Sequence, residues 1–119
     1  MCGIVFFSFS FSQNGKPHIS FKDTKYNFGF VKQGQVVKIE YDFTNTGKEP
    51  LIISDIEVTC GCTVAEFPRY PIHSGESGII LITFNTKEKE DRQDRTVNVI
   101  SNASNSPAKL RFKGVVQKK

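Results

Sequence analysis

The sequence predicts an all-β fold, a β-sandwich of about seven strands joined by Greek-key connections. Three observations support this prediction. Short apolar segments recur along the chain and are separated by turn-forming residues such as Gly, Pro and Asn. One segment alternates strictly between apolar and polar residues. No segment shows the sustained 3.6-residue period of an amphipathic helix.

The first half of the chain contains the clearest strand. Residues 37–43 read V-K-I-E-Y-D-F, an alternation that is typical of a strand with one buried and one solvated face. Turns are predicted on either side of it, at 32–35 and at 45–50. Further strands are predicted at 18–21, at 26–31 with a kink at Gly29, and at 51–58, where the strand leads into a pair of cysteines.

The second half of the chain is less regular. Residues 78–84 (GIILITF) are apolar on both faces, which predicts either a central strand packed on two sides or a strand that pairs deep in a sandwich. The charged run at 87–95 (KEKEDRQDR) is predicted to be a solvated hairpin loop, with a partial helix as the alternative. Two more strands are predicted, one with Val97 and Val99 and one with Leu110 and Phe112. Irregular or turn structure is predicted for the remaining segments, 65–71, 72–78 and 102–107.

Composition sets limits on what holds the fold together. The chain has 119 residues, which suits one domain, and 11 Phe but no Trp, so Phe must supply most of the large core side chains. Three cysteines are too few for a disulfide-dense scaffold. The net charge of +4 is spread along the chain, which is typical of a solvated surface. No segment approaches the roughly 20 apolar residues of a membrane-spanning helix.

The N-terminal segment resembles part of an export signal. Residues 1–12 (MCGIVFFSFSFS) carry no charge and are followed abruptly by polar residues. Ser10 and Ser12 are small residues at the two positions that signal peptidase reads, which would make Gln13 the first mature residue. The alternative is a short strand or tail rich in Phe and Ser. The first interpretation predicts an exported protein, periplasmic or extracellular, in which Cys2 is removed or is a spare thiol.

The most informative motif is Cys60-Gly61-Cys62. In an extended strand, residues i and i+2 face the same side with Cα atoms about 6.5 Å apart, and Gly61 permits the bend that a disulfide would need. Such a small ring would stabilise the fold little and would be easy to reduce. The pair is therefore a redox or disulfide element, a two-thiolate metal site, or two small side chains packed in the core.

A metal site would need additional ligands. Structural zinc takes about four, whereas Cu(I) suits a pair of thiolates. His73 is the candidate third ligand beside Cys60 and Cys62, although both His18 and His73 are otherwise expected to be exposed surface residues. No cofactor is the leading prediction, and Cu(I) is the alternative.

Sequence signals of enzymes are absent. The chain has no G-x-S-x-G, no glycine-rich phosphate loop and no H-E-x-x-H. Lys109, Arg111 and Lys113 alternate with apolar residues in the last strand and so share one face, and that face has no aromatic residue. They are therefore interpreted as a solvated strand face and not as a nucleic-acid platform. We therefore expect a protein without enzymatic activity that does not bind nucleic acid.

Four segments together resemble a bacterial family known as domain of unknown function 1573. Its hallmarks are F-x-F-x-N-T-G-x-x-P-L-x-I, a C-G-C-T block, P-I-x-x-G-E and a late strand ending in G-V. Here they read YDFTNTGKEPLII at 41–53, CGCT at 60–63, PIHSGE at 71–76 and KGVV at 113–116. The resemblance extends over about 21–116.

The resemblance implies an immunoglobulin-like sandwich akin to PapD-type chaperones and major-sperm-protein domains. It implies an exported protein and no established reaction. Members often have a glycine-centred hairpin where this chain has the charged run 87–95. The motif positions carried over from the family are Phe43, Asn45, Gly47, Pro50, Gly61, Thr63, Pro71, Gly75 and Gly114.

These observations predict an exported immunoglobulin-like module that binds other envelope or secreted proteins through a strand edge or loops. The alternative is a thiol redox or copper-handling protein that acts through Cys60 and Cys62. The predicted organisation is a signal remnant at 1–12, a lead-in at 13–20, the domain at 21–116 and a tail at 117–119. The oligomeric state, monomeric or higher, does not follow from the sequence.

Overall fold

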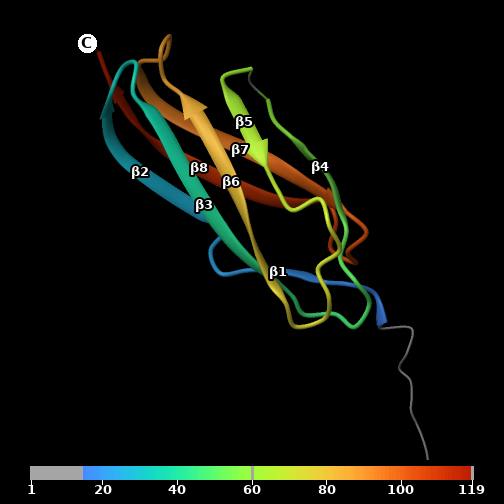
Figure 1. Ribbon diagram of the computed structural model, residues 1–119. Coiled ribbons are helices and arrows are strands. Elements are labelled where there is room, and N and C mark those ends of the chain that lie inside the picture. Colours follow the sequence, from blue (N-terminus) through green and yellow to red (C-terminus); the bar gives the residue numbers. More distant parts are fainter. Residues whose placement is uncertain (1–14, 60, 119) are drawn as a thin grey trace, which may run out of the picture.

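The computed structural model describes residues 15–59 and 61–118, which form two packed β-sheets (Figure 1). The predicted export signal lies outside these residues. The strands are β1 (Ile19–Phe21), β2 (Lys25–Lys32), β3 (Val36–Asn45), β4 (Ile53–Glu57), β5 (Thr63–Glu66), β6 (Ser77–Asn85), β7 (Asp91–Ser101) and β8 (Ala108–Gln117). One sheet has the order β1-β3-β6-β5 and the other β2-β8-β7-β4. The predicted all-β sandwich is confirmed, with eight described strands instead of about seven.

The chain crosses repeatedly between the two sheets. Only β5–β6 and β7–β8 are both consecutive in sequence and adjacent in a sheet, and the other connections between the described strands pass from one sheet to the other. This pattern agrees with the Greek-key connections that were expected. No helix of the described chain is long and apolar enough to cross a membrane.

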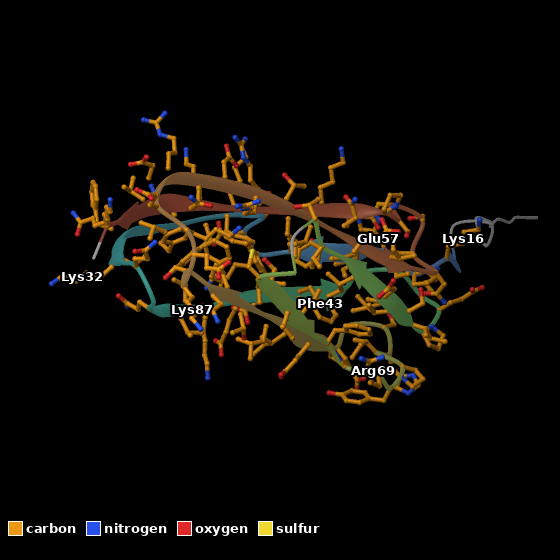
Figure 2. All side chains as sticks on the ribbon, turned by 90° about the horizontal axis from the view of Figure 1, so that it is seen from above. Lys16, Lys32, Phe43, Glu57, Arg69 and Lys87 are labelled. Atoms are coloured by element: carbon orange, nitrogen blue, oxygen red, sulfur yellow. The ribbon has the colours of Figure 1, made fainter. Side chains whose placement is uncertain are left out.

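The alternating segment of β3 behaves as its pattern predicts. Its odd-numbered side chains from Val37 to Phe43 are buried between the sheets, and the even-numbered ones are exposed. The same side of β6 contributes Ile80, Ile82 and Phe84 to the core. Phe43 is 1% exposed, and Figure 2 labels it near the middle of the sandwich. Burial of this shared apolar face is what pairs the two sheets.

One of the two interpretations of β6 is wrong. Its apolar run is not packed on both faces, because Ile79 is 46% exposed. β6 is central within its sheet, between β3 and β5. The described residues place no further layer on the outer side of that sheet (Figure 1). An apolar pattern cannot distinguish a strand with two sheet neighbours from a strand with two covered faces.

The predicted kink at Gly29 is a β-bulge. The register of β2 against β8 shifts between Asn27 and Gly29, and Gly29 has a φ of +76°. This left-handed conformation suits glycine because it has no Cβ. The extra residue directs Phe28 inward against the other phenylalanines and leaves Phe30 on the outer side. The bulge thus decides which aromatic ring is buried.

Two segments of the second half are strands that the sequence analysis assigned otherwise. β5 includes Ala65 and Glu66, which were placed in an irregular crossing segment. β7 begins at Asp91, so only the first part of the charged run 87–95 is a loop. Pairing with β8 supplies the hydrogen bonds that extend β7 through these charged residues. Within the run, Gln93 is buried and its side-chain Nε2 donates a hydrogen bond to the main-chain oxygen of Glu90 at 3.0 Å.

Tyr41 connects the two sheets by a hydrogen bond. Its ring is 2% exposed, and its hydroxyl donates to the main-chain oxygen of Arg111 in β8 at 2.7 Å. Burial raises the pKa of the Tyr41 hydroxyl well above its ordinary value, and the neighbouring Tyr26 raises it further. The phenol therefore contributes stability while it is protonated.

Tyr41→Phe is expected to change the stability of the protein in alkaline solution. A folded-state pKa above the unfolded value of about 10 means that the contribution is complete below pH 10 and is lost as the pH rises beyond it. The variant should lose about 1 kcal/mol below pH 10 through the missing hydrogen bond. Its unfolding free energy should then fall less steeply above that pH than that of the wild type. Urea denaturation across this pH range measures both effects. If the unfolding free energies of the wild type and the variant changed in parallel with pH, the raised pKa of Tyr41 would be contradicted.

Candidate functional site

The family motifs divide between the two ends of the sandwich. The loops that follow β3 and precede β6 meet at the end where β1 lies, whereas the cysteine motif lies at the other end (Figure 1). That second end also holds the β2–β3 turn and the loop between β6 and β7. The two ends therefore need separate descriptions.

Asn45 organises the first end. It is fully buried, and its Nδ2 donates to the main-chain oxygens of Glu49 at 2.8 Å and Ile72 at 2.9 Å. Its Oδ1 accepts from the main-chain nitrogens of Gly47 at 2.9 Å and His18 at 3.3 Å. One side chain thus joins the turn after β3, the loop before β6 and the entry to β1.

Other motif residues complete this loop cluster. The main-chain nitrogen of Gly75 donates to the oxygen of Asn45 at 2.8 Å. A Cβ on Gly47 would lie 2.7 Å from the Cα of Pro17, so only glycine fits there. Pro50 is exposed and its carbonyl accepts from Asn102 Nδ2 at 3.2 Å, while Pro71 is exposed. The N-T-G and P-I-x-x-G-E motifs are therefore two halves of one structural element.

The cysteine motif lies in the connection between β4 and β5, which crosses from one sheet to the other. Gly61 and Cys62 are in a turn and Thr63 begins β5, so this part of the motif is not the extended strand assumed from the sequence. Cys62 packs against the core, its sulfur lies 3.8 Å from the Thr63 hydroxyl, and it is disulfide-bonded. Cys60 and Cys2 lie outside the described residues, so the Cys60–Cys62 pairing stays a prediction.

The structure does not bring His73 to Cys62. His73 lies in the loop before β6, and its main-chain nitrogen donates to Glu76 Oε1 at 3.0 Å. The main-chain oxygen of Cys62 instead accepts from Asn85, at the far end of β6, at 2.9 Å. The length of this strand separates the two by about 27 Å. A copper site of Cys60, Cys62 and His73 is therefore not supported by this arrangement.

A groove runs beside the cysteine turn on the outer side of the β3–β6–β5 sheet. It has a volume of about 540 Å³. Its apolar part comes from Val36 and Val64, which are 47% and 56% exposed. The other residues that line it are Gly61, Cys62, Thr83, Asn85, Lys87, Glu88 and Lys89. We call it the β5 groove.

The strand that borders the β5 groove is an edge strand. β5 has β6 as its neighbour on one side and no described strand on the other. The main-chain oxygen of Cys62 accepts a hydrogen bond from Asn85. In an antiparallel pair every second residue directs its main-chain groups to the partner strand, so Val64 also directs its N–H and C=O groups towards β6. The main-chain N–H and C=O groups of Thr63 and Ala65 therefore point to the open side. An edge with free peptide groups beside an apolar groove can accept a further strand.

The fold and its edge define a class: an immunoglobulin-like sandwich of the PapD and major-sperm-protein type. Residues 19–116 match the family model described as "Protein of unknown function (DUF1573)", and the chain belongs to this family. The resemblance drawn from the sequence is thus confirmed, whereas the match does not confirm the C-G-C-T block as a hallmark. The matched range begins with β1. A comparison with curated proteins finds no match.

Solved structures share this fold at low sequence identity. A protein of unknown function from Porphyromonas gingivalis W83 has 17% identity and a TM-score of 0.75, with 96% of this chain and 53% of that chain covered. PapD-like domain 7 of human CEP192 has 11% identity and a TM-score of 0.67, with 88% and 89% covered. The YadV chaperone has 17% identity and a TM-score of 0.54, with 85% and 52% covered. The chain thus spans about half the length of the P. gingivalis protein.

Sequence reasoning singled out Gly61 and Cys62 but missed the other residues of the β5 groove. Val36 precedes the alternating segment of β3, and Val64 lies in a strand that was not predicted. Lys87 and Lys89 were expected to be solvated loop residues, and nothing in their spacing indicates a groove. Only the pairing of both β3 and β5 with β6 brings these four side chains together.

Proposed function

We propose that the chain is an exported, non-enzymatic binding module that captures an extended segment of another envelope or secreted protein as an additional strand beside β5. One observation carries the proposal: an open strand edge lies next to an apolar groove. Main-chain hydrogen bonds to a strand edge supply affinity, and neighbouring side-chain pockets supply specificity.

The lining of the β5 groove indicates what kind of segment would fit. An added strand would place alternate side chains on the outer side of the sheet, next to Val64. Apolar side chains there would cover the exposed parts of Val64 and Val36. Lys87 and Lys89 at the rim favour an acidic residue near one end of the segment. The expected ligand is thus an extended peptide with alternate apolar residues and a terminal acidic residue.

Selection from a display library of random nonapeptides tests this proposal. We expect the wild type to select peptides with the pattern described above. Ala65→Pro should abolish their binding, because it removes an N–H that points to the open side without removing a bond to β6. Val64→Asp should weaken binding at least tenfold, which corresponds to about 1.4 kcal/mol.

Ile79→Asp is the matched control. It also introduces an Asp on the outer face of this sheet, and Ile79 is exposed to a similar extent as Val64 (46% and 56%) but does not line the β5 groove. It should leave peptide binding unchanged, and thermal unfolding should show that all three variants are folded. Selected peptides that bind Ala65→Pro as well as the wild type would sink the proposal, and so would the failure of the wild type to select any extended peptide.

Export is proposed from the uncharged N-terminal segment and the small residues before Gln13. N-terminal sequencing of the protein recovered from the cell envelope or medium should find Gln13 first. A mature protein that retains Met1 would contradict this part of the proposal.

A thiol redox function is the second candidate, and the position of Cys62 favours it. Cys62 is disulfide-bonded and lines the β5 groove. A dithiol reductant that entered there would supply two electrons to the disulfide and leave as a disulfide itself. Thiol alkylation and mass spectrometry, before and after mild reduction, should show two newly alkylated cysteines. Resistance to mild reductant would eliminate this candidate, and a Cu(I) titration of the reduced protein against Cys62→Ser would test copper handling.

A further inference from the structure

A second surface, remote from the β5 groove, gathers most of the unbalanced charge of the protein. Three hollows of about 450, 610 and 230 Å³ lie over the outer side of β2, β8 and β7, and Arg111 lines all three. Figure 2 shows nitrogen-tipped side chains standing away from this layer. The charged residues that line the hollows are Lys25, Arg92, Asp94, Lys109, Arg111 and Lys113. We call this surface the basic face.

Strand pairing spreads these charges in two dimensions. Along β8, Lys109, Arg111 and Lys113 are exposed and alternate with the buried Leu110 and Phe112. Across the sheet, Lys25 of β2 pairs directly with Arg111. Neighbouring strands lie about 4.8 Å apart, and residues two apart on a strand lie about 6.8 Å apart. The result is a patch of cations and not a single row.

The basic face accounts for the net charge of the whole chain. It holds five of the 16 basic residues and one of the 12 acidic residues, so the remaining basic and acidic residues are equal in number. The one acid, Asp94, accepts a hydrogen bond from Arg111 Nε at 2.7 Å. Hydrogen bonds from Arg111 lower the pKa of Asp94, so it stays ionised and paired.

An exposed aromatic ring adjoins these cations. Phe30 is 73% exposed and lines a hollow together with Arg92 and Lys113. Phe30 pairs with Val115 of β8, whose side chain is also on the outer side. The bulge at Gly29 changes which residues of β2 face outward, and so places Phe30 on that side. An apolar side chain amid basic ones provides the two signals that interfacial membrane binding requires.

We propose that the basic face docks the protein on an anionic lipid surface, with the Lys and Arg side chains at the lipid phosphates and the Phe30 ring at the headgroup boundary. The two-dimensional spread of the cations matches a planar array of headgroups. Proteins that bind single-stranded nucleic acid instead use several stacking rings along a groove. Here the described rings are Phe30, which the register places on the outer side, and Tyr26, which is 45% exposed and lines one hollow beside Lys25 and Arg111 although it pairs with the buried Phe112. Two separate rings do not form such a series.

Vesicle co-sedimentation of the full chain tests this proposal. The wild type should sediment with phosphatidylcholine vesicles that contain phosphatidylglycerol, not with phosphatidylcholine alone, and less at high salt. The variant Lys25→Gln/Lys109→Gln/Lys113→Gln should bind about a hundredfold more weakly, because each basic residue near such a surface contributes about fivefold. Phe30→Ser should weaken the binding that remains at high salt.

The control removes three lysines from other surfaces: Lys38→Gln/Lys48→Gln/Lys87→Gln. It has the same net charge as the first variant and should retain most of the vesicle binding, and thermal unfolding should show that both variants are folded. The proposal is overturned if the wild type does not sediment with anionic vesicles or if the control loses as much binding as the first variant. It is also overturned if an oligothymidylate binds the basic face more tightly than the vesicles do.

Discussion

Asn45→Asp is expected to lower the free energy of unfolding by about 3 kcal/mol or more at neutral pH. The substitution preserves the shape of the side chain but replaces the Nδ2 donor with an oxygen. That oxygen would face the carbonyl oxygens of Glu49 and Ile72, which accept from Asn45 at 2.8 and 2.9 Å. The site is fully buried, so neither solvent nor a counter-ion offsets the repulsion. Domains of this size have about 5–15 kcal/mol of stability in total, so the loss is a large fraction.

Urea denaturation of the Asn45 variant at neutral and acidic pH provides the measurement. Burial beside carbonyl oxygens should raise the pKa of the introduced carboxyl, so its cost should shrink as the pH falls and the group takes up a proton. Asn27→Asp is the matched control, because Asn27 is exposed. Its Oδ1 accepts a hydrogen bond from the main-chain nitrogen of Gly29 at 2.8 Å, which an aspartate can also accept. A loss in the Asn45 variant no larger than in this control would show that Asn45 does not hold the loops together.

Gly114→Ala is expected to cost about 2–4 kcal/mol, because the space for a Cβ is already filled. The new methyl carbon would lie 2.6 Å from Cζ of Phe28 and closer still to Cδ1 and Cε1. The ring of Phe28 cannot move aside freely, since it packs against Phe84 and Phe112 with centroid distances of 5.9 and 6.5 Å. Either the ring leaves the core or β2 shifts away from β8.

A double-mutant cycle with Phe28→Ala separates this clash from other effects of the new methyl group. Phe28→Ala alone should cost about 3 kcal/mol, the lower end for a core Phe, because Phe28 is only partly buried. Adding Gly114→Ala should then cost little, so the two substitutions should be coupled by about 2 kcal/mol. Gly61→Ala is the control, because no atom lies within 4 Å of a Cβ placed there. Additive losses would contradict the interlocking of Phe28 with Gly114.

The sheet-forming segments could be predicted where a local pattern reports burial. The alternation at 37–43 predicted the middle of β3 and its buried face, although the strand extends over Val36–Asn45, and Gly29 marked the bulge in β2. β5 and the first half of β7 could not be predicted, because their sequences are short or highly charged. They are strands because β6 and β8 offer them a partner edge, and that information is not local.

The candidate sites show the same division. The motif residues Asn45, Gly47 and Gly75 were recognised as a set, but the sequence does not indicate that they meet in one loop cluster. The sequence analysis interpreted the alternating cations of β8 as a solvated face because no aromatic residue of that strand shares their face. The ring that adjoins them belongs to β2, which is distant in sequence and adjacent in the sheet.

The sequence by itself determined the class of fold and the family, because both depend on periodicity and on motifs that lie within short stretches of chain. Tertiary structure alone decided that His73 lies far from Cys62, that β5 has a free edge beside a groove, and that Phe30 lies among the cations of the basic face. Each of these depends on which strands are neighbours and in which register. Strand order and register are set by the packing of the whole sandwich and not by any one segment.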